Sequence, residues 1–329
     1  MHECARAASM NSGARSWIPW LAAAGVGSLT AVQSRANGSL GSILDSGLHA
    51  SVVSFAVGLT VLTLVGLAVR RIRFGMVRLL AALRFGAMPW WWATGGVFGA
   101  LFIFSQSFAV GIIGVALFAV ALVSGQNLAS LIVDAVGLGP RGRQPVSVVR
   151  MASSMIGIVA VGVAVSGRAG EDSLSAPAVA LCVIAGIGVA VQQALNGRLT
   201  TISREPMAAA WANFAVGSFI LTLALLMITA TGARALEPLP AGPWWLYLGG
   251  IIGATFIATT AWVVGKVGVL AISLLVTAGQ LTGALVLDVV ILDVVDGPLI
   301  AGALLSFGAV ALTAVGTSRN RSSFTPDTP

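Results

Sequence analysis

The sequence carries very little charge for its length. Asp, Glu, Lys and Arg make up 9% of its 329 residues, whereas a soluble domain carries about 25%. It has two cysteines and two histidines, too few and too scattered for a disulfide framework or a metal site. It has no phosphate-binding loop, dinucleotide fingerprint or zinc-protease motif. These absences argue against an enzyme, a cofactor, a bound metal and an ATP-hydrolysing pump subunit.

Apolar residues fill most of the chain instead. Hydrophobic residues make up 57% of the sequence, and 40 residues are glycine, which lets membrane helices approach one another closely. The apolar runs are long enough to cross the roughly 30 Å hydrocarbon layer of a bilayer. They are continuous rather than alternating, which favours helices over barrel strands. The sequence therefore predicts an all-α integral membrane protein.

We expect ten transmembrane helices, one for each apolar run. The first five occupy 17–36, 48–69, 90–109, 112–133 and 147–166, and the other five occupy 177–197, 207–229, 244–265, 267–290 and 297–316. The formal net charge of +7 comes from arginines that lie mostly in the loops between these runs. In such places they indicate membrane topology and contact with anionic lipid, and not binding to nucleic acid.

A ten-residue motif that occurs twice reveals an internal duplication. AVQSRANGSL spans Ala31–Leu40, and AVQQALNGRL spans Ala190–Leu199. The offset between them, 192 − 33 = 159, also relates two FAVG segments, which begin at Phe55 and Phe214. Later pairs follow an offset of 243 − 89 = 154: Pro-Trp-Trp at 89 and 243, Gly-Gln at 125 and 279, and Asp134 with Asp288. Matches in one order along both halves indicate a duplicated five-helix unit.

The positions of Lys and Arg predict the orientation in the membrane. With the N-terminus in the cytoplasm, fifteen of the 18 Lys and Arg residues face inward and three face outward, as the positive-inside rule requires. Each repeat has an odd number of crossings, so the second copy enters from the opposite side. A pseudo-two-fold axis in the membrane plane would then relate the two copies. The expected units are a disordered cytoplasmic tail (1–16), two five-helix repeats (17–166 and 177–316), an outer linker (167–176) and a second cytoplasmic tail (317–329).

On these residues the chain resembles the drug/metabolite transporter superfamily, of the EamA-like type. The resemblance rests on Gln33 and Asn37 with Gln192 and Asn196, on the FAVG pair, on Pro-Trp-Trp followed by Gly-Gly, and on Gly-Gln followed by Asp. It covers about residues 20–316 and is closest to a tandem fusion of two five-helix inner-membrane exporter modules. It implies a ten-helix carrier with a central cavity for small metabolites or drugs. The first copy has Ser34 and Arg35 where the second has Gln193 and Ala194, so the half-sites differ chemically.

Amides within the apolar runs are the candidate substrate-binding residues, because polar groups at this depth are costly unless they face a cavity or another helix. The candidates are Gln33, Asn37, Gln106, Gln126, Gln192, Asn196 and Gln280. They either bind a neutral or zwitterionic solute or hydrogen-bond between helices, at about 0.6 kcal/mol each. The Asn-Gly steps at 37–38 and 196–197 also fit a helix C-cap. That chemistry favours a structural role for Gln33 and Gln192.

Asp134 and Asp288 are the only carboxylates that the two repeats share. The expected topology places Asp134 near the cytoplasmic end of its helix and Asp288 near the outer end of its helix. Carboxylates inside membrane proteins serve in proton relays. At a helix end they are more often solvated or paired with a loop arginine, such as Arg141 or Arg143 near Asp134. Proton coupling and a structural role therefore both remain open.

The sequence favours a secondary transporter of the inner membrane with both termini in the cytoplasm. It would export a small organic metabolite or drug by alternating access, driven by an ion gradient that could be protons. The expected partners are a small-molecule substrate and the lipid bilayer. Two alternatives stay open: a membrane scaffold or sensor subunit without transport, and a passive facilitator or channel. A channel is disfavoured because the sequence shows no filter-like loop or charged ring.

Overall fold

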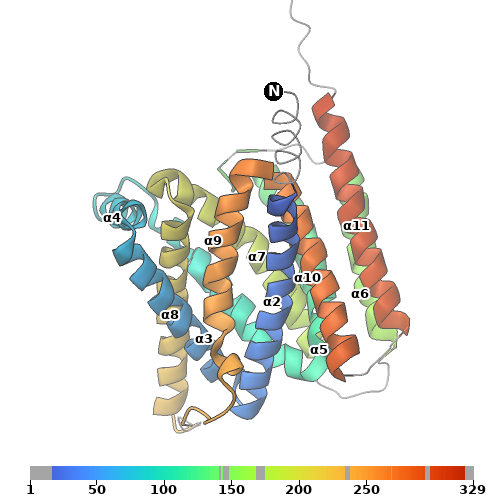
Figure 1. Ribbon diagram of the computed structural model, residues 1–329, viewed down its shortest axis with the longest axis horizontal. Helices are drawn as coiled ribbons and strands as arrows, with labels where there is room; N and C mark the ends of the chain where they lie inside the picture. Colours follow the sequence, from blue (N-terminus) through green and yellow to red (C-terminus); the bar gives the residue numbers. More distant parts are fainter. Residues whose placement is uncertain are drawn as a thin grey trace, which may run out of the picture.

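The computed structural model describes residues 17–140, 142–143, 148–167, 175–233, 238–267, 269–292 and 297–322, and all regular structure within them is helical. The first half contains α2 (Ile18–Ile43), α3 (Gly47–Ala68), α4 (Arg70–Arg84), the 3-10 turn η1 (Trp90–Thr94), α5 (Gly95–Val136) and α6 (Val148–Ser166). The second contains α7 (Ser175–Ser203), α8 (Pro206–Ala230), η2 (Trp244–Tyr247), α9 (Gly249–Val267), α10 (Val269–Leu292) and α11 (Gly297–Ser322). The helices form one bundle, with α6 and α11 packed together along one side (Figure 1). The expected tail 1–16 and most of the expected linker lie outside the described residues.

Apolar length agrees with a membrane protein. Four described stretches are long and apolar enough to cross a bilayer: Gly47–Ala68, Trp90–Val136, Ala176–Ser203 and Pro206–Ala230. Shorter apolar helices occur at Met151–Ser166, Gly249–Thr260, Leu274–Val290 and Gly297–Leu312. The helix α2 is not in either group, since its second half carries Gln33, Ser34, Arg35 and Asn37. The prediction of an all-helical membrane protein is confirmed.

Two of the predicted helices are segments of α5, separated by a break at Gly114. A straight helix of its 42 residues would be about 63 Å long, twice the thickness of the hydrocarbon layer. Gly114 has φ 78° and ψ 169°, a conformation open to glycine and strained for other residues. The chain returns at this point, because the start of α5 at Gly95 and the loop after its end at Leu138 both lie beside the C-terminal half of α7. The first segment (95–113) and second segment (115–136) are thus two helical segments that run in opposite directions.

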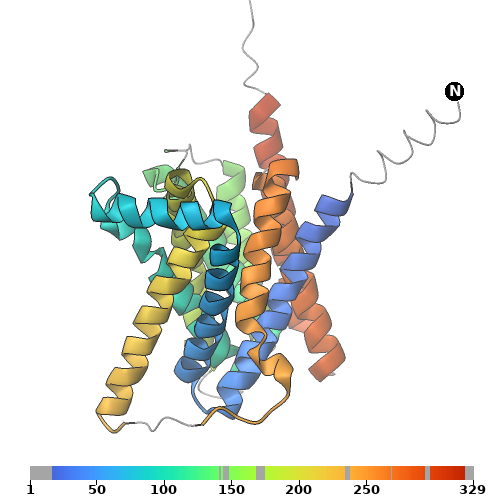
Figure 2. The ribbon, with the colours of Figure 1, turned by 60° about the vertical axis from the view of Figure 1, so that its left-hand side comes forward.

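The segment Arg70–Arg84, expected to be a cytoplasmic loop, is the helix α4. A single residue, Val69, separates it from α3. Its apolar residues Ile72, Met76 and Leu79 follow helical spacing and are buried, as in an amphipathic helix. The segment has no long apolar run, because five of its fifteen residues are arginines, so the sequence did not predict this helix. In Figure 2, α4 lies across the ends of the bundle helices.

The repeat offsets relate contacts between the two halves. A side chain at Gly27 of α2 would collide with the carbonyl oxygen of Val276 in α10. Its repeat mate, Gly186 of α7, meets the carbonyl oxygen of Leu122 in the second segment of α5 in the same way. The reciprocal pairs also match: Gly279 with Ala24, and Gly125 with Val183. Each motif helix therefore packs through glycine on a helix of the opposite repeat.

The two FAVG segments lie against each other. The rings of Phe55 in α3 and Phe214 in α8 are 4.8 Å apart between centroids. Each ring covers the glycine of the other segment, Phe214 over Gly58 and Phe55 over Gly217. Residue 55 thus lies opposite 217 while 58 lies opposite 214, so α3 and α8 run antiparallel.

The turns after the two motif helices share one unusual backbone conformation. Asp45 has φ 46° and Arg204, its mate at the offset of 159, has φ 55°. Positive φ is uncommon for residues other than glycine. Ser46 then caps α3 by accepting a 3.2 Å hydrogen bond from His49 N–H, while Glu205 occupies the same position before α8.

Candidate functional site

Three polar side chains join α2 to the first segment of α5 and form the first amide cluster. Asn37 Nδ2 donates to Gln106 Oε1 at 2.8 Å, and Gln106 Nε2 donates to Ser34 Oγ at 2.8 Å. Ser34 Oγ in turn donates to the Thr30 carbonyl at 2.9 Å. Asn37 and Gln106 are fully buried. In this conformation both amides are used for contacts between helices.

The helix α9 closes the other side of this cluster. Asn37 Oδ1 is buried without a hydrogen-bond partner and lies directly against the Cα of Gly249, next to Ser54. One turn later, Gly253 lies beside the amide of Gln33, which is 4% exposed. The two glycines of α9 therefore make room for the two amides of α2.

The second amide cluster joins α7 to α8. Gln192 Nε2 donates to Asn213 Oδ1 at 3.0 Å, and Asn213 Nδ2 donates to Asn196 Oδ1 at 3.2 Å. Gly95 and Gly99 of α5 face this cluster, as their mates Gly249 and Gly253 face the first. Asn213 is buried, whereas Gln192 and Asn196 are half-buried. Sequence reasoning singled out all of these amides except Asn213, which has Ser54 as its mate.

The Asn-Gly steps do not end their helices, so the C-cap expectation is wrong. The helix α2 continues to Ile43 and α7 to Ser203. Gly38 lies against Val110 of α5, and Gly41 lies against the Ser107 carbonyl. Glycine serves here for close approach of two helices.

Gln126 and Gln280 lie at two helix contacts that the repeat relates, one in each half of the chain. Gln126 lies where α5 meets α7 at Gly186, and Gln280 lies where α10 meets α2 at Gly27. Both are half-buried. Gln126 Nε2 donates to Gln193 Oε1 at 3.3 Å. In the sequence Gln193 is notable only as the residue at the position of Ser34, and no sequence signal pairs it with Gln126.

Asp288 caps the second segment of α5. Its two carboxylate oxygens accept hydrogen bonds from Val115 N–H at 3.1 Å and Ala116 N–H at 2.7 Å. A carboxylate suits the unpaired N–H groups and positive dipole end of a helix. Asp288 is 2% exposed. Its mate Asp134 is half-buried in the last turn of α5, and Arg141 lies outside the described residues.

Arg198, one of the arginines counted for the topology, joins α7 to the end of α5. Its side chain donates to the carbonyls of Leu138 at 2.5 Å and Gly137 at 2.9 Å. Its guanidinium lies 5.0 Å from the ring centroid of Trp92. A cation at this position complements the negative end of the α5 dipole. The repeat mate, Ser39, has no charge.

The apolar spans and buried amides of this all-helical bundle are those of a membrane protein and fit a membrane transport protein. The family model described as "Putative inner membrane exporter, YdcZ" matches residues 18–165 and again 177–318. The chain belongs to this family, and the match to two tandem modules confirms the resemblance inferred from the sequence. No curated protein matches the chain. A solved crystal structure is 18% identical, covers 93% of this chain and 98% of its own, and has a TM-score of 0.58, which shows a shared fold.

Proposed function

We propose that the protein is a secondary transporter that exports a small organic metabolite or drug across the inner membrane by alternating access. The observation that carries this proposal is the pair of amide clusters, which are related by the repeat offset yet bonded differently. In a carrier built from two repeats, each end state has one half-site packed more tightly than the other.

Helix directions support an inverted repeat. The mates α3 and α8 pack antiparallel through their FAVG segments. An axis along the membrane normal would leave mated helices parallel, whereas an axis in the membrane plane reverses them. Antiparallel mates therefore favour two inverted five-helix units, spanning 17–166 and 177–316.

We further propose that this conformation is closed at the outer end. On the topology expected from the arginines, the C-terminal half of α2 lies outside and that of α7 lies inside, with both termini cytoplasmic. Gly41 packs on Ser107 of α5 at the proposed outer end. At the proposed inner end, Gly197 meets Pro140 in the loop after α5. The opposite state would bring the C-terminal half of α7 onto α9 instead.

The substrate site in this proposal lies between the halves and is lined by amides. Gln126, Gln280, Gln33 and Gln192, with Asn37, Asn196 and Gln106, could hold a neutral or zwitterionic solute without burying a net charge, which the membrane interior penalises. Asp134 and Asp288 are the candidates for proton coupling. The carboxylate of Asp288 accepts two hydrogen bonds from helix-end N–H groups, and protonation of this carboxylate would weaken them.

Transport by purified protein in proteoliposomes tests the function. Labelled small zwitterionic and neutral metabolites are loaded, and efflux is measured with and without an imposed proton gradient. Saturable efflux that responds to the gradient is expected. Flux that rises linearly with concentration would indicate a channel instead. The absence of flux for every labelled compound would favour the scaffold alternative.

A further inference from the structure

The inner face of α4 is fully used by the protein. Ile72, Met76 and Leu79 are buried, and Gly75 lies against Ala208 at the start of α8. This face therefore packs on the turn that joins α7 to α8 and leaves the opposite face of the helix outward.

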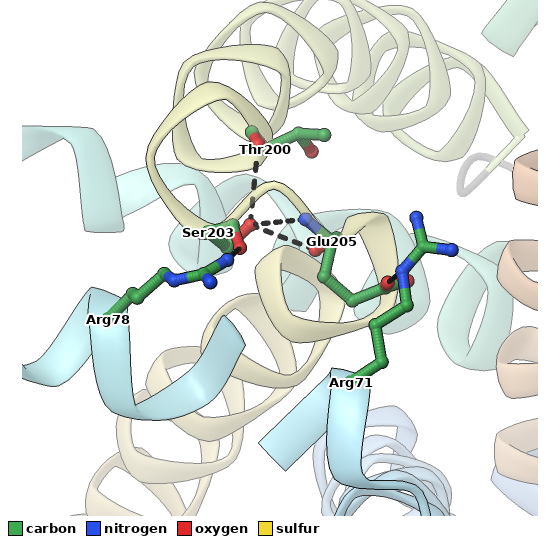
Figure 3. Close-up of polar contacts among 5 residues, drawn as sticks. All are labelled: Arg71, Arg78, Thr200, Ser203 and Glu205. Atoms are coloured by element: carbon green, nitrogen blue, oxygen red, sulfur yellow. Dashed lines mark hydrogen bonds and ion pairs between the residues drawn. The ribbon is translucent and has the colours of Figure 1, made fainter. Parts of the chain in front are cut away.

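Two arginines of α4 also serve this turn. Arg71 Nε forms a 2.6 Å ion pair with Glu205 Oε2, and Arg78 Nη1 donates to the Ser203 carbonyl at 3.1 Å. Ser203 Oγ accepts from Glu205 N–H at 3.2 Å and donates to the Glu205 carbonyl at 2.9 Å. Figure 3 shows both arginines reaching from α4 toward the turn. These contacts fix the rotation of α4 about its own axis.

The outward face of α4 combines bulky apolar residues with arginines. Phe74, Val77 and Leu80 are 57%, 55% and 54% exposed, and Phe85, just after the helix, is 79% exposed. Arg70, Arg73 and Arg84 are exposed on the same side. Within the described part of the chain none of the three forms an ion pair, and Arg73 Nη1 donates to the Leu67 carbonyl at 3.3 Å. Apolar residues beside cations that form no ion pair are typical of helices that lie in the interface of a membrane.

The position of α4 in the chain places it at the membrane surface. It begins one residue after α3, which is a membrane span, and the next span starts at Trp90. Trp90 and Trp91 are exposed, and such residues are enriched at the level of the headgroups. Both ends of α4 are thus held at the boundary of the hydrocarbon. Figure 1 shows α4 end-on at the edge of the bundle.

We propose that α4 is a binding site for anionic phospholipid. Phe74, Val77 and Phe85 enter the boundary of the acyl chains, while Arg70, Arg73 and Arg84 bind the phosphate groups of acidic headgroups. Guanidinium groups suit this ligand because they bind phosphate through two parallel hydrogen bonds. Through Arg71 and Arg78, the bound lipid stabilises the α7–α8 turn. This site is separate from the substrate site, so it stands whether or not transport is observed.

Quenching by brominated lipid tests the proposal. The full chain, with Cys4→Ser, carries a fluorophore on a cysteine introduced at Ala81, which lies on the outward side of α4; the remaining Cys182 is buried. The protein is placed in nanodiscs of phosphatidylcholine that contain a small fraction of brominated phosphatidylglycerol or, separately, of brominated phosphatidylcholine. Phosphatidylglycerol should quench at least about twofold more strongly, and high salt should remove the difference because surface charge is screened.

Charge variants connect this preference to the three arginines. The triple change R70Q, R73Q and R84Q should abolish the preference, while R143Q, R319Q and R321Q remove the same charge elsewhere and should retain it. Equal quenching by both lipids in the unmutated protein would overturn the proposal, as would a preference that survives the α4 triple change. If the triple variant does not fold, the salt titration of the unmutated protein decides alone.

Discussion

The two copies of the ten-residue motif place the same amides in equivalent positions but bond them to different helices. Asn37 of α2 bonds to Gln106 on the first segment of α5, the third span of its own repeat. Asn196 of α7 bonds to Asn213 on α8, the second span of its own repeat. The difference follows from two substitutions between the halves, Gln106 to Thr260 and Ser54 to Asn213.

Side-chain length explains why these substitutions redirect the bonds. The hydroxyl of Thr260 donates to the Phe256 carbonyl of its own helix at 2.8 Å, as threonine hydroxyls in helices often do. It leaves no amide with which to reach α7. A duplicated fold thus keeps its backbone contacts while a few polar residues decide which pair of helices is joined.

The largest expected effect, a loss of transport, concerns Gln126 and Gln280. The two residues occupy equivalent positions in the repeats but differ in hydrogen bonding. Replacing either by Leu should abolish transport in proteoliposomes if both amides line the site, while the amount and thermal stability of folded protein stay nearly unchanged. Gln193→Leu is the matched control, because it breaks the Gln126 bond from the other side. If Gln193→Leu has the same effect as Gln126→Leu, the bond between them is what matters. Normal transport by both the Gln126 and Gln280 variants would remove these residues from the site.

The next comparison concerns the glycines that face the two clusters. Gly249→Ala should destabilise the protein by about 1–3 kcal/mol, because the new methyl group would overlap Asn37 Oδ1 in a packed region. A methyl group at Gly95 would lie 3.3 Å from Asn196 Oδ1. Gly95→Ala should therefore stay within about 1 kcal/mol of the unmutated protein, a gain in helix propensity offsetting the close contact. Thermal unfolding in detergent measures both variants, and equal losses would contradict the asymmetry.

Removing the amide that joins α2 to α5 should destabilise the protein by an amount similar to or smaller than the Gly249→Ala clash. Gln106→Leu removes the acceptor of the buried Asn37 amide and the donor to Ser34 Oγ, although Ser34 keeps its bond to the Thr30 carbonyl. Leaving the Asn37 amide unsatisfied costs about 1–3 kcal/mol. Thr260→Val removes only a hydroxyl bonded to its own helix, so its change should be under about 0.5 kcal/mol. Unfolding of both variants is compared in one detergent. A Gln106 variant as stable as the Thr260 variant would show that the first cluster does not hold the helices together.

The smallest effect is expected in the second cluster. Asn213→Ser makes α8 resemble α3 at this position and removes two hydrogen bonds, each worth about 0.6 kcal/mol. The partners are half-buried, so rearrangement should keep the loss near 1 kcal/mol. Ser218→Ala on the same helix is the control, since Ser218 Oγ is buried without a partner and its removal should not destabilise. A loss larger than that of Gln106→Leu would reverse the ranking of the two clusters.

Sequence reasoning reached the all-helical membrane class and the tandem repeat but misjudged local features whose signals are ambiguous. The Asn-Gly steps fit a C-cap equally well as close helix packing, and only the neighbouring Val110 and Ser107 decide between them. The arginine-rich pattern of α4 fits both a loop and an interfacial helix. Asn213 lies within a predicted span, but its contact with Gln192 depends on how α7 lies against α8.

The sequence by itself determined the membrane class, the tandem repeat and the family, because apolar length and motif order are local properties that need no partner. The tertiary structure decided where the polar groups go. Asp288 lies 172 residues along the chain from the Ala116 N–H that it caps, and no local pattern predicts such a contact. The pairing of Asn37 with Gln106, and not with an equivalent of Asn213, likewise depends on which helices meet. Hydrogen bonds act over about 3 Å, so their partners are set by packing and not by order in the chain.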